Sequence, residues 1–331
     1  EGDAVASSFN SLANLLDKQQ AGSVSLAQDA VTAVNLLTGE LANVNSRILS
    51  SGQSGQSPNS LLDLRDRLID DIAKFSDITT TYSDRGVASI SLGSSGVGPV
   101  ILDQNNSVAL GFSNETGVMR YFLSSGGNSA PTSQIKSGVL AGLADAYAMV
   151  REVVKEVNHL ANLVSIEINT QHKMGVDLDG NPGRQMFSTN GLLLEESPAN
   201  TSSLAVELQV TDLDLLPENQ LDLKYNSAEE SWVLTGSEIN EPLYGEDRIV
   251  GPGFVLEIFG TPNDGDYYTL KKNQDAASTI QFLLKRPQEI AAASAKMVSA
   301  NNENLSESEL KVELIKDDRT LIQSPISDTL L

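Results

Sequence analysis

The sequence contains no cysteine and only two histidines among its 331 residues. Without thiols the chain has no disulfide framework, no thiolate metal site and no cysteine nucleophile. Aromatic residues are also scarce, at 5%, and Trp232 is the one tryptophan. This composition suits narrow seams of small aliphatic side chains better than large globular cores.

Basic residues are outnumbered two to one, with 22 Lys and Arg against 44 Asp and Glu, for a net charge of -22 and a pI near 4.3. Such a surface repels phosphate groups, so we expect neither nucleic acid nor anionic lipid as a partner. No apolar run approaches the roughly 20 residues that a membrane-spanning helix needs, so we expect no membrane insertion. The acidity favours a well-solvated secreted protein. The first residues lack a basic, apolar signal sequence, and the start on Glu1 without methionine suggests an excised fragment.

What the chain does contain is a long helical pattern from Gly138 to His172. Apolar residues recur along it at steps of three and four, which predicts one amphipathic helix with a narrow apolar stripe. The pattern stops at a turn-rich segment, residues 175–183. A stripe this narrow needs partner helices of similar length. The seam residues predicted on this helix are Val150, Val154, Val157 and Val164.

Two upstream stretches supply candidate partner helices. Residues 4–49 keep two heptad phases of small apolar residues, which predicts one long helix or two in tandem. A kink or break is expected near Gly22, because glycine costs about 1 kcal/mol in a helix interior. Residues 58–75 carry a shorter amphipathic pattern after a Ser- and Gly-rich connector, with Ser57 or Asn59 as its cap. The seam residues predicted on these helices are Leu37, Leu41, Val44, Ile48, Leu64, Leu68 and Ile72.

Two regions switch to the alternating pattern of β-strands. Between Ile78 and Leu123, short alternating runs are separated by Gly- and Asn-rich turns, and residues 126–129 are predicted to be a linker back to the long helix. Between 204 and 270, further runs alternate as half-buried antiparallel strands do, with Trp232 expected in their core. Residues 274–294 are predicted to be a short helix and turn.

Together these patterns predict an α+β fold: an elongated bundle of long antiparallel helices with a small β-hairpin insertion and a separate antiparallel β domain. A chain of 35.3 kDa is long enough for two or three domains. We assign residues 1–77 and 134–176 to the helical bundle domain, 78–133 to the β insertion and 177–294 to the β-rich outer domain. Residues 295–331 are expected to begin a further β segment or to extend the outer domain.

Two features invite a metal or proton-transfer interpretation. The loop from Asp177 to Asn181 offers oxygen ligands, but it lacks the third acidic position and the bidentate glutamate of an EF-hand loop. Asp, Gly, Asn and Pro also end helices and turn the chain, so we favour a turn and expect no metal. His159 and His172 lie thirteen residues apart on one predicted helix, roughly 20 Å along its axis, and therefore cannot bind one ion.

No enzyme motif emerges from the remaining polar residues. The 44 carboxylates include pairs that a glycosidase could use, but no pair lies among aromatic residues that would stack on a sugar. The glycine clusters at 93–98 and 251–253 lack the lysine and serine or threonine of a phosphate-binding loop. We therefore expect no catalytic residue and no cofactor.

Three sets of motifs occur in the order in which one known family carries them. In chain order they are LLDLRDRLIDDI (61–72), then GVLAGL (138–143) with NTQH (169–172) and GVDLDGNPG (175–183), and then FGTPNDGD (259–266) with DAA (275–277) and IAAAS (290–294). By these motifs the chain resembles the flagellar hook-associated proteins that join hook to filament in bacteria, the FlgK family, as a central fragment lacking both terminal segments. It departs from the pattern at Leu64, where the family has a glutamine, and after Ser294, where no motif follows.

The resemblance implies a structural protein of the bacterial flagellum that acts by subunit packing and not by catalysis. Copies would self-associate in a helical lattice, with hook protein on one side and a second hook-associated junction protein on the other. The family implies an extracellular location, export without a cleaved signal peptide, and an export chaperone. In this family helices from both chain ends complete the bundle, so part of the apolar stripe would be uncovered in this chain.

Two other classes of protein are open alternatives. A secreted adhesin or carbohydrate-binding surface module would use the helices as a stalk. It would carry a closed, sugar-sized pocket in residues 190–331, lined by Trp232, Tyr244, Tyr267 or Tyr268. An acid-rich hydrolase would instead place two carboxylates across a cleft, with perturbed pKa values.

Overall fold

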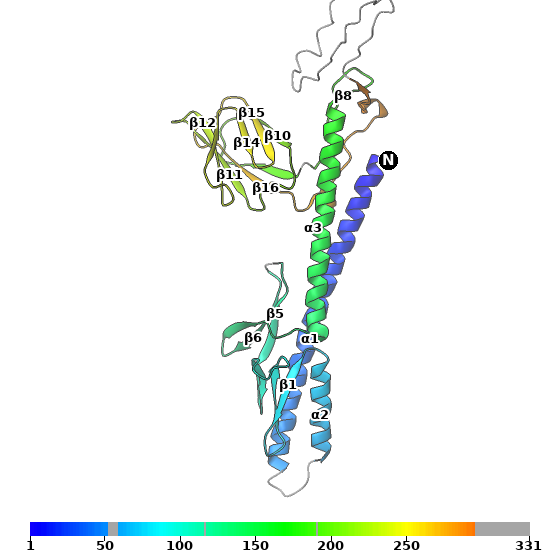
Figure 1. The fold of residues 1–331 in the computed structure, drawn as a ribbon, viewed down its shortest axis with the longest axis vertical. Helices are drawn as coiled ribbons and strands as arrows, with labels where there is room; N and C mark the ends of the chain where they lie inside the picture. The colour runs from blue at the N-terminus through cyan, green and yellow to red at the C-terminus, as the bar shows by residue number, and fades with distance from the viewer. Residues whose placement is uncertain (52–58, 116, 190, 295–331) are drawn as a thin grey trace, which may run out of the picture. The chain divides into compact units, whose positions relative to one another are not determined.

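The computed structural model describes residues 1–51, 59–115, 117–189 and 191–294 (Figure 1). The chain separates into two compact units: Asn10–Val157, here termed the helix–insertion unit, and Glu1–Phe9 together with the chain from Asn158 onward, termed the sandwich unit. The domain boundaries proposed above, which group the helices apart from the β insertion, stay a prediction. The connector at 52–58, with the candidate cap Ser57, and the segment 295–331 lie outside the described residues.

The three expected long helices are present as α1 (Gly2–Ser51), α2 (Asn59–Ala73) and α3 (Gly138–Lys173). With the antiparallel sheets described below, they confirm the α+β class. The break considered near Gly22 is wrong, because α1 runs through this position as one helix, and a kink there stays a prediction. A single glycine costs about 1 kcal/mol, which the helical turns on either side of it outweigh.

Two small antiparallel sheets lie between α2 and α3 in the chain. One has the order β1-β2-β3-β4 and the other the order β5-β6-β7. Their strands are β1 (Ile78–Tyr82), β2 (Ala88–Leu92), β3 (Val100–Asp103), β4 (Asn106–Ser107), β5 (Ala109–Ser113), β6 (Arg120–Ser125) and β7 (Asn128–Thr132).

The linker predicted at residues 126–129 is wrong, because this segment forms a hairpin between β6 and β7. Ser125 pairs with Asn128, which leaves Gly126 and Gly127 as the two turn residues. Their φ angles of 58° and 85° lie in the left-handed region. A two-residue turn with positive φ at both positions matches the twist of paired strands and favours glycine, so the glycines mark a turn and not a flexible linker.

One hydrophobic core holds the helix–insertion unit together. It combines side chains from α1, α2, the first turns of α3 and both small sheets. Figure 1 shows α2 alongside the C-terminal half of α1, as the expected packing of the helical stretches requires. The largest fully buried side chains of this core are Leu41, Ile48, Ile72, Ile90, Leu92, Ile101, Leu102 and Leu140.

The sandwich unit contains two antiparallel sheets that share one core. The five-stranded sheet has the order β13-β12-β11-β16-β9, and the three-stranded sheet has the order β10-β15-β14. The strands are β9 (Leu192–Glu196), β10 (Ala205–Val210), β11 (Leu221–Asn226), β12 (Ser231–Gly236), β13 (Leu243–Gly245), β14 (Arg248–Gly251), β15 (Phe254–Phe259) and β16 (Tyr267–Lys272).

Trp232 is fully buried in this core, as expected, with the rings of Tyr225 and Tyr268 at 5.3 and 5.8 Å. Strand β9 was not anticipated. Its first three residues are all leucine, so the run has no alternation from which a strand could be recognised.

Short elements complete the sandwich unit. They are the strands β8 (Gly175–Val176) and β17 (Ala293–Ser294), which pair with each other, the helix α4 (Ala276–Thr279) and the 3-10 turn η2 (Pro287–Glu289). Ala6, Phe187 and Ile280 form a second, smaller cluster. Within the described ranges, no helix is both long and apolar enough to cross a membrane.

Candidate functional site: the packing faces of the long helices

The predicted seam residues fall into two groups. Seven of them lie in the core of the helix–insertion unit, where Leu41, Val44 and Ile48 are buried and Leu37 is half-buried. The members from α2 are Leu64, Leu68 and Ile72. The four valines of α3, Val150, Val154, Val157 and Val164, are half-buried and lie outside the three hydrophobic clusters of the described residues. That these side chains form a functional seam stays a prediction.

Two asparagines on α1 bind the main chain of the β insertion. The Asn35 side chain donates to the carbonyl of Leu110 at 2.8 Å and accepts from its N–H at 2.8 Å. Buried Asn45 does the same with Ala88, and also donates to the carbonyl of Gln104. A side-chain amide has a donor and an acceptor spaced like those of a peptide, so each asparagine completes the hydrogen bonding of a strand.

The end of α2 contacts the start of α3, although the β insertion separates the two helices in the sequence. The N–H groups of Val139 and Leu140 donate to the carbonyls of Lys74 and Phe75, at 3.1 and 3.0 Å. The free N–H groups at the start of one helix therefore bond the free carbonyls just beyond the end of another. A Cβ on Gly138 would come within 2.6 Å of the Phe75 backbone, so only glycine fits this junction.

Tyr121 of β6 also binds this junction. Its hydroxyl donates to the Leu140 carbonyl at 2.7 Å, and burial raises the pKa of Tyr121 to about 12. The phenol is therefore neutral and a donor at physiological pH.

A row of polar side chains runs along the second half of α3, within the sandwich unit. Its spacing of three and four residues keeps the row on one face of the helix. The members are Asn158, Asn162, Ser165, Asn169 and His172, and all are buried except half-buried Asn158. Such side chains are stable in a core only where they are hydrogen-bonded.

The row binds the irregular segments that follow α3 and β16. Asn162 accepts from the N–H of Gly191 at 3.1 Å and from the hydroxyl of Thr189 at 2.6 Å, and donates to the carbonyl of Asn273. Asn158 accepts from the N–H of Ala277 at 2.8 Å.

Nearer the end of α3, Asn169 and His172 continue the row. Asn169 accepts from the N–H groups of Met186 and Phe187, at 2.7 and 2.9 Å, and donates to the Phe187 carbonyl. The ring nitrogens of His172 contact the Arg184 carbonyl and the Ala291 N–H. The row thus provides hydrogen-bond partners for main-chain N–H and C=O groups that are not paired within a strand or a helix.

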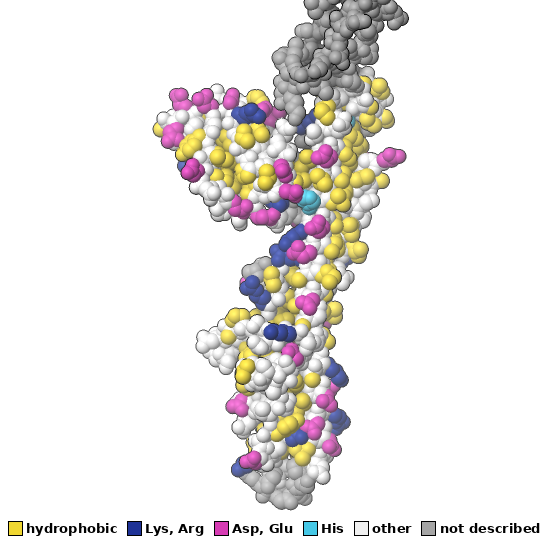
Figure 2. Space-filling model, in the orientation of Figure 1, with side chains coloured by type: hydrophobic (Ala, Val, Ile, Leu, Met, Phe, Trp, Pro, Cys, Tyr) yellow, Lys and Arg dark blue, Asp and Glu magenta, His cyan; other side chains and the backbone are white. Residues whose placement is uncertain are grey.

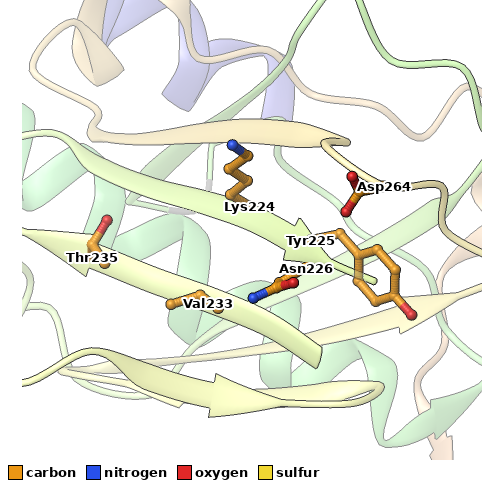
Figure 3. Close-up of a pocket in the computed structure, with 6 residues that line it drawn as sticks. All are labelled: Lys224, Tyr225, Asn226, Val233, Thr235 and Asp264. Atoms are coloured by element: carbon orange, nitrogen blue, oxygen red, sulfur yellow. The ribbon is translucent and has the colours of Figure 1, made fainter. Parts of the chain in front are cut away.

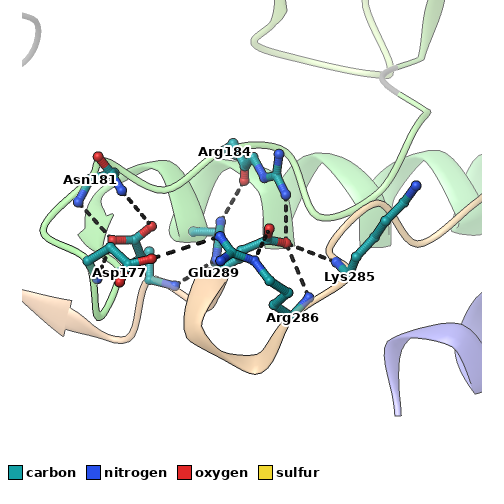
Figure 4. Close-up of polar contacts among 9 residues, drawn as sticks. Asp177, Asn181, Arg184, Lys285, Arg286 and Glu289 are labelled. Atoms are coloured by element: carbon teal, nitrogen blue, oxygen red, sulfur yellow. Dashed lines mark hydrogen bonds and ion pairs between the residues drawn. The ribbon is translucent and has the colours of Figure 1, made fainter.

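The segment that begins at Asp177 is a turn, as favoured above (Figure 4). One oxygen of Asp177 accepts from the N–H groups of Asp179 and Asn181, at 2.9 and 2.7 Å. The bond from the Asn181 N–H is the main reason that the pKa of Asp177 is lowered. The described residues contain no group of three or more acidic or histidine side chains placed to hold a metal ion.

Glu289 is the centre of a second polar cluster near this turn (Figure 4). Its carboxylate accepts from the N–H of Lys285 at 2.9 Å, from the Arg286 side chain at 3.1 Å and from Arg184 at 2.6 Å. These bonds, first that from Lys285, lower the pKa of Glu289 to about 2. The carboxylate ties the chain after β16 to the loop after α3.

The five-stranded sheet carries an open depression of about 480 Å³ at the β11–β12 hairpin (Figure 3). It is lined by Lys224, Tyr225, Asn226, Val233, Thr235 and Asp264. The four aromatic residues expected to line a sugar pocket are not among these. Trp232 and Tyr268 are buried in the core, Tyr244 is exposed, and the hydroxyl of Tyr267 binds Asp222.

None of the described carboxyl groups with a clearly shifted pKa has the raised pKa of a general acid. In five carboxyl groups the pKa is lowered, and the largest cause is a hydrogen bond donated to the carboxylate. These groups are Asp177, Glu195, Glu238, Asp264 and Glu289. Burial opposes ionisation of Asp266, but bonds from the Ser202 side chain and three backbone N–H groups outweigh it and lower its pKa. A general acid needs the opposite shift.

Apolar side chains remain exposed along α3 (Figure 2). Met149 is 70% exposed and Val153 is 42% exposed, and Leu160 and Leu163 are exposed in the next two turns. They are spaced by three, four and seven residues, which places them on one face. This face lies beside the half-buried valines and is available for contact.

Sequence reasoning missed the asparagines of α1 and the polar row of α3. The row has a signal, since polar residues recur at 158, 162, 165, 169 and 172 with helical spacing. This pattern does not distinguish polar residues that are buried against loops from polar residues that are exposed to water. From the sequence alone, the row is therefore interpreted as a solvent-exposed face.

The helices described above match a known family. A family model described as the flagellar hook-associated protein FlgK helical domain matches residues 1–187. Flagellar hook-associated protein 1 of Escherichia coli K12 is 24% identical over 275 residues, covering 80% of this chain and 50% of the relative. The Bacillus subtilis 168 protein of the same name is 25% identical over 238 residues, covering 64% and 47%. The chain thus spans about half the length of these relatives.

A solved structure also has a similar fold. The flagellar hook junction protein FlgK from Burkholderia pseudomallei superposes with a TM-score of 0.59 and 22% identity, over 87% of this chain and 54% of that one. At this identity the likeness concerns the fold. The family model covers more than half of this chain and the very residues that form α1, α2, the insertion and α3. The chain belongs to the family of flagellar hook-associated proteins FlgK.

Proposed function

We propose that this chain is part of a structural protein of the bacterial flagellum that adapts hook to filament by subunit packing and not by catalysis. The observation that carries the proposal is the match of the FlgK helical-domain family to residues 1–187, the same stretch in which the long helices pack through one core. In the proposed role, the helices give stiffness and the sheets act as spacers.

The exposed apolar face of α3 supports a role in assembly. Monomeric proteins rarely leave contiguous apolar stripes in water, and such stripes mark interaction surfaces. In the flagellum this face would be covered by other segments of a longer protein or by neighbouring copies in a helical lattice. Contacts of that kind are heterologous and do not close into a dimer.

The proposed partners follow from the family. We infer hook protein on one side and a second hook-associated junction protein on the other, an export chaperone before assembly, and an extracellular location reached without a cleaved signal peptide. The acidic surface, with a net charge of -22, supports a secreted and well-solvated protein.

Deletion of the gene tests the proposal. We expect cells that keep their hooks, release filament subunits into the medium and do not swim, and that recover when the full-length gene is restored. Cells that assemble normal filaments without the gene would refute the adaptor role.

A substitution in the exposed face gives a sharper test. Met149→Glu with Val153→Glu places charges where packing would bury apolar groups, so we expect a folded protein that does not restore swimming. Lys155→Gln, an exposed polar position away from this face on the same helix, is the control and should restore it. Full recovery with the double variant would contradict packing through this face.

A further inference from the structure

His172 is a buried histidine whose two ring nitrogens both have main-chain partners. The side chain is in the last turns of α3 and is 5% exposed. Nδ1 lies 2.5 Å from the Arg184 carbonyl oxygen, and Nε2 lies 2.8 Å from the Ala291 amide nitrogen. A carbonyl only accepts and an amide N–H only donates. The ring is therefore neutral, with its proton on Nδ1 and its lone pair on Nε2.

A second proton changes only one of these two contacts. The imidazolium ring carries a donor on each nitrogen. Its Nδ1–H still faces the Arg184 carbonyl, whereas its Nε2–H faces the N–H of Ala291, donor against donor. We propose that His172 is an acid-sensitive latch, which holds the segment at Ala291 when neutral and releases that segment, but not the one at Arg184, when protonated.

The latch joins three segments in a place without spare room. A Cβ on Gly183 would lie 1.8 Å from the His172 carbonyl oxygen and 2.8 Å from the Ala291 Cβ. This close packing leaves little room for a local rearrangement, so in the proposed latch loss of the Ala291 bond moves this segment away. Ala293 pairs with Val176 two residues further along, so opening also frees the β8–β17 pair.

The charged groups near the ring do not titrate in the range where imidazole does. On α3, the residues one turn before His172 are Ile168 and Asn169, which carry no charge. The charged groups on the segments around the ring, residues 173–184 and 285–291, are Lys173, Asp177, Asp179, Arg184, Lys285, Arg286 and Glu289, and hydrogen bonds lower the pKa of Asp177. Lysine and arginine keep their charge between pH 8 and 5. Glu289 stays ionised because its hydrogen bonds lower its pKa to about 2.

Hydrogen exchange of the intact chain between pH 8 and 5 tests the proposal. Protection is corrected for the intrinsic pH dependence of exchange and followed in peptides by mass spectrometry. Protonation of Nε2 removes the acceptor that the Ala291 N–H needs, so protection at this contact should be lost as the pH falls. We expect this loss in the peptide containing Ala291 and no loss in that containing Met186 and Phe187, which Asn169 holds.

Two variants separate the latch from general acid sensitivity. His172→Gln keeps one donor and one acceptor but does not titrate, so protection at Ala291 should become independent of pH. His159→Gln changes the other histidine, half-buried on the same helix, and should retain the wild-type response.

Three results would overturn the latch. These are protection at Ala291 that does not change between pH 8 and 5, equal losses at Ala291 and at Met186, and a ring proton on Nε2. The last is read from the nitrogen chemical shifts of His172 in the unaltered chain at neutral pH, so the test holds even if His172→Gln does not fold.

Discussion

The packing faces of α1 and α3 are built on different principles. From Ala27 to Ile48, α1 packs against helices and sheets mainly through apolar side chains, and two asparagines add bonds to the insertion. From Asn158 to His172, α3 packs a nearly continuous row of polar side chains against irregular chain. Strands and helices pair their own backbone groups, so apolar contact suffices there. Loops leave N–H and C=O groups unpaired, and a helix that buries them has to supply partners.

The largest effect is expected from shortening an apolar side chain on α1. Leu41→Ala empties part of a fully buried site and should lower the free energy of unfolding of the helix–insertion unit by about 2–5 kcal/mol. Denaturant unfolding followed by circular dichroism measures this loss. Fluorescence of Trp232, in the core of the sandwich unit, should not change. Leu36→Ala, at a 69% exposed position, is the control, and an equal loss there would show that burial is not the cause.

Removing a polar side chain from the row on α3 should cost nearly as much. Asn162→Ala leaves buried groups of Thr189, Gly191 and Asn273 unpaired, and we expect a loss of about 2–4 kcal/mol, since each such group costs about 1–3. Trp232 fluorescence in denaturant reports it, with exposed Thr170→Ala as the control. Asn162→Leu fills the same space without hydrogen bonds. If this variant were as stable as the wild type, the row on α3 would not need hydrogen-bonding side chains, and the two packing faces would not differ in principle.

Two glycines at the start of α3 should respond with opposite signs. Gly138 has a φ of 78° and no room for a Cβ, so Gly138→Ala should destabilise the helix–insertion unit by about 1–3 kcal/mol. Gly142→Ala, on an open helix surface, should stabilise it by about 0.5–1 kcal/mol. Thermal unfolding measures both shifts. Equal shifts would mean that the contact between α2 and α3 is not tight.

The smallest effect concerns pH. The pKa of Glu289 is about 2 in the folded chain, below its ordinary 4.5, so the folded state binds fewer protons than the unfolded state. The stability it contributes is complete above pH 4.5 and is lost as the pH falls towards 2. Glu289→Gln should remove this part of the acid slope while leaving stability near pH 7 only slightly lower. An unchanged slope between pH 4.5 and 2 would contradict the role of the cluster.

Most of the architecture could be read from side-chain periodicity. The helices α1, α2 and α3 begin and end within a few residues of their predicted limits, because long amphipathic stripes and a Gly- and Pro-rich exit are strong local signals. The prediction of strands failed where alternation was missing, as in β9. It also failed before β7, where two glycines of a hairpin turn were interpreted as a linker.

The contacts of the candidate site were only partly predictable. The apolar seam on α1 could be listed from the sequence because burial of leucine and valine is the rule. The roles of Asn45, Asn162 and His172 could not, because a buried polar side chain and a solvated one have the same local sequence pattern. What distinguishes them is the main chain of residues 29 to 119 positions away, as the partners Ala88, Gly191, Asn273 and Ala291 show.

By itself, the sequence determined which stretches are helical, which alternate as strands and to which family the motifs point, since these depend on neighbours a few residues apart. The tertiary structure alone decided which polar side chains are buried, that α2 and α3 meet end to end, and that one imidazole holds a single tautomer. These features depend on hydrogen bonds with groups that are distant in the sequence. The local sequence around each residue does not show which distant group will be its partner.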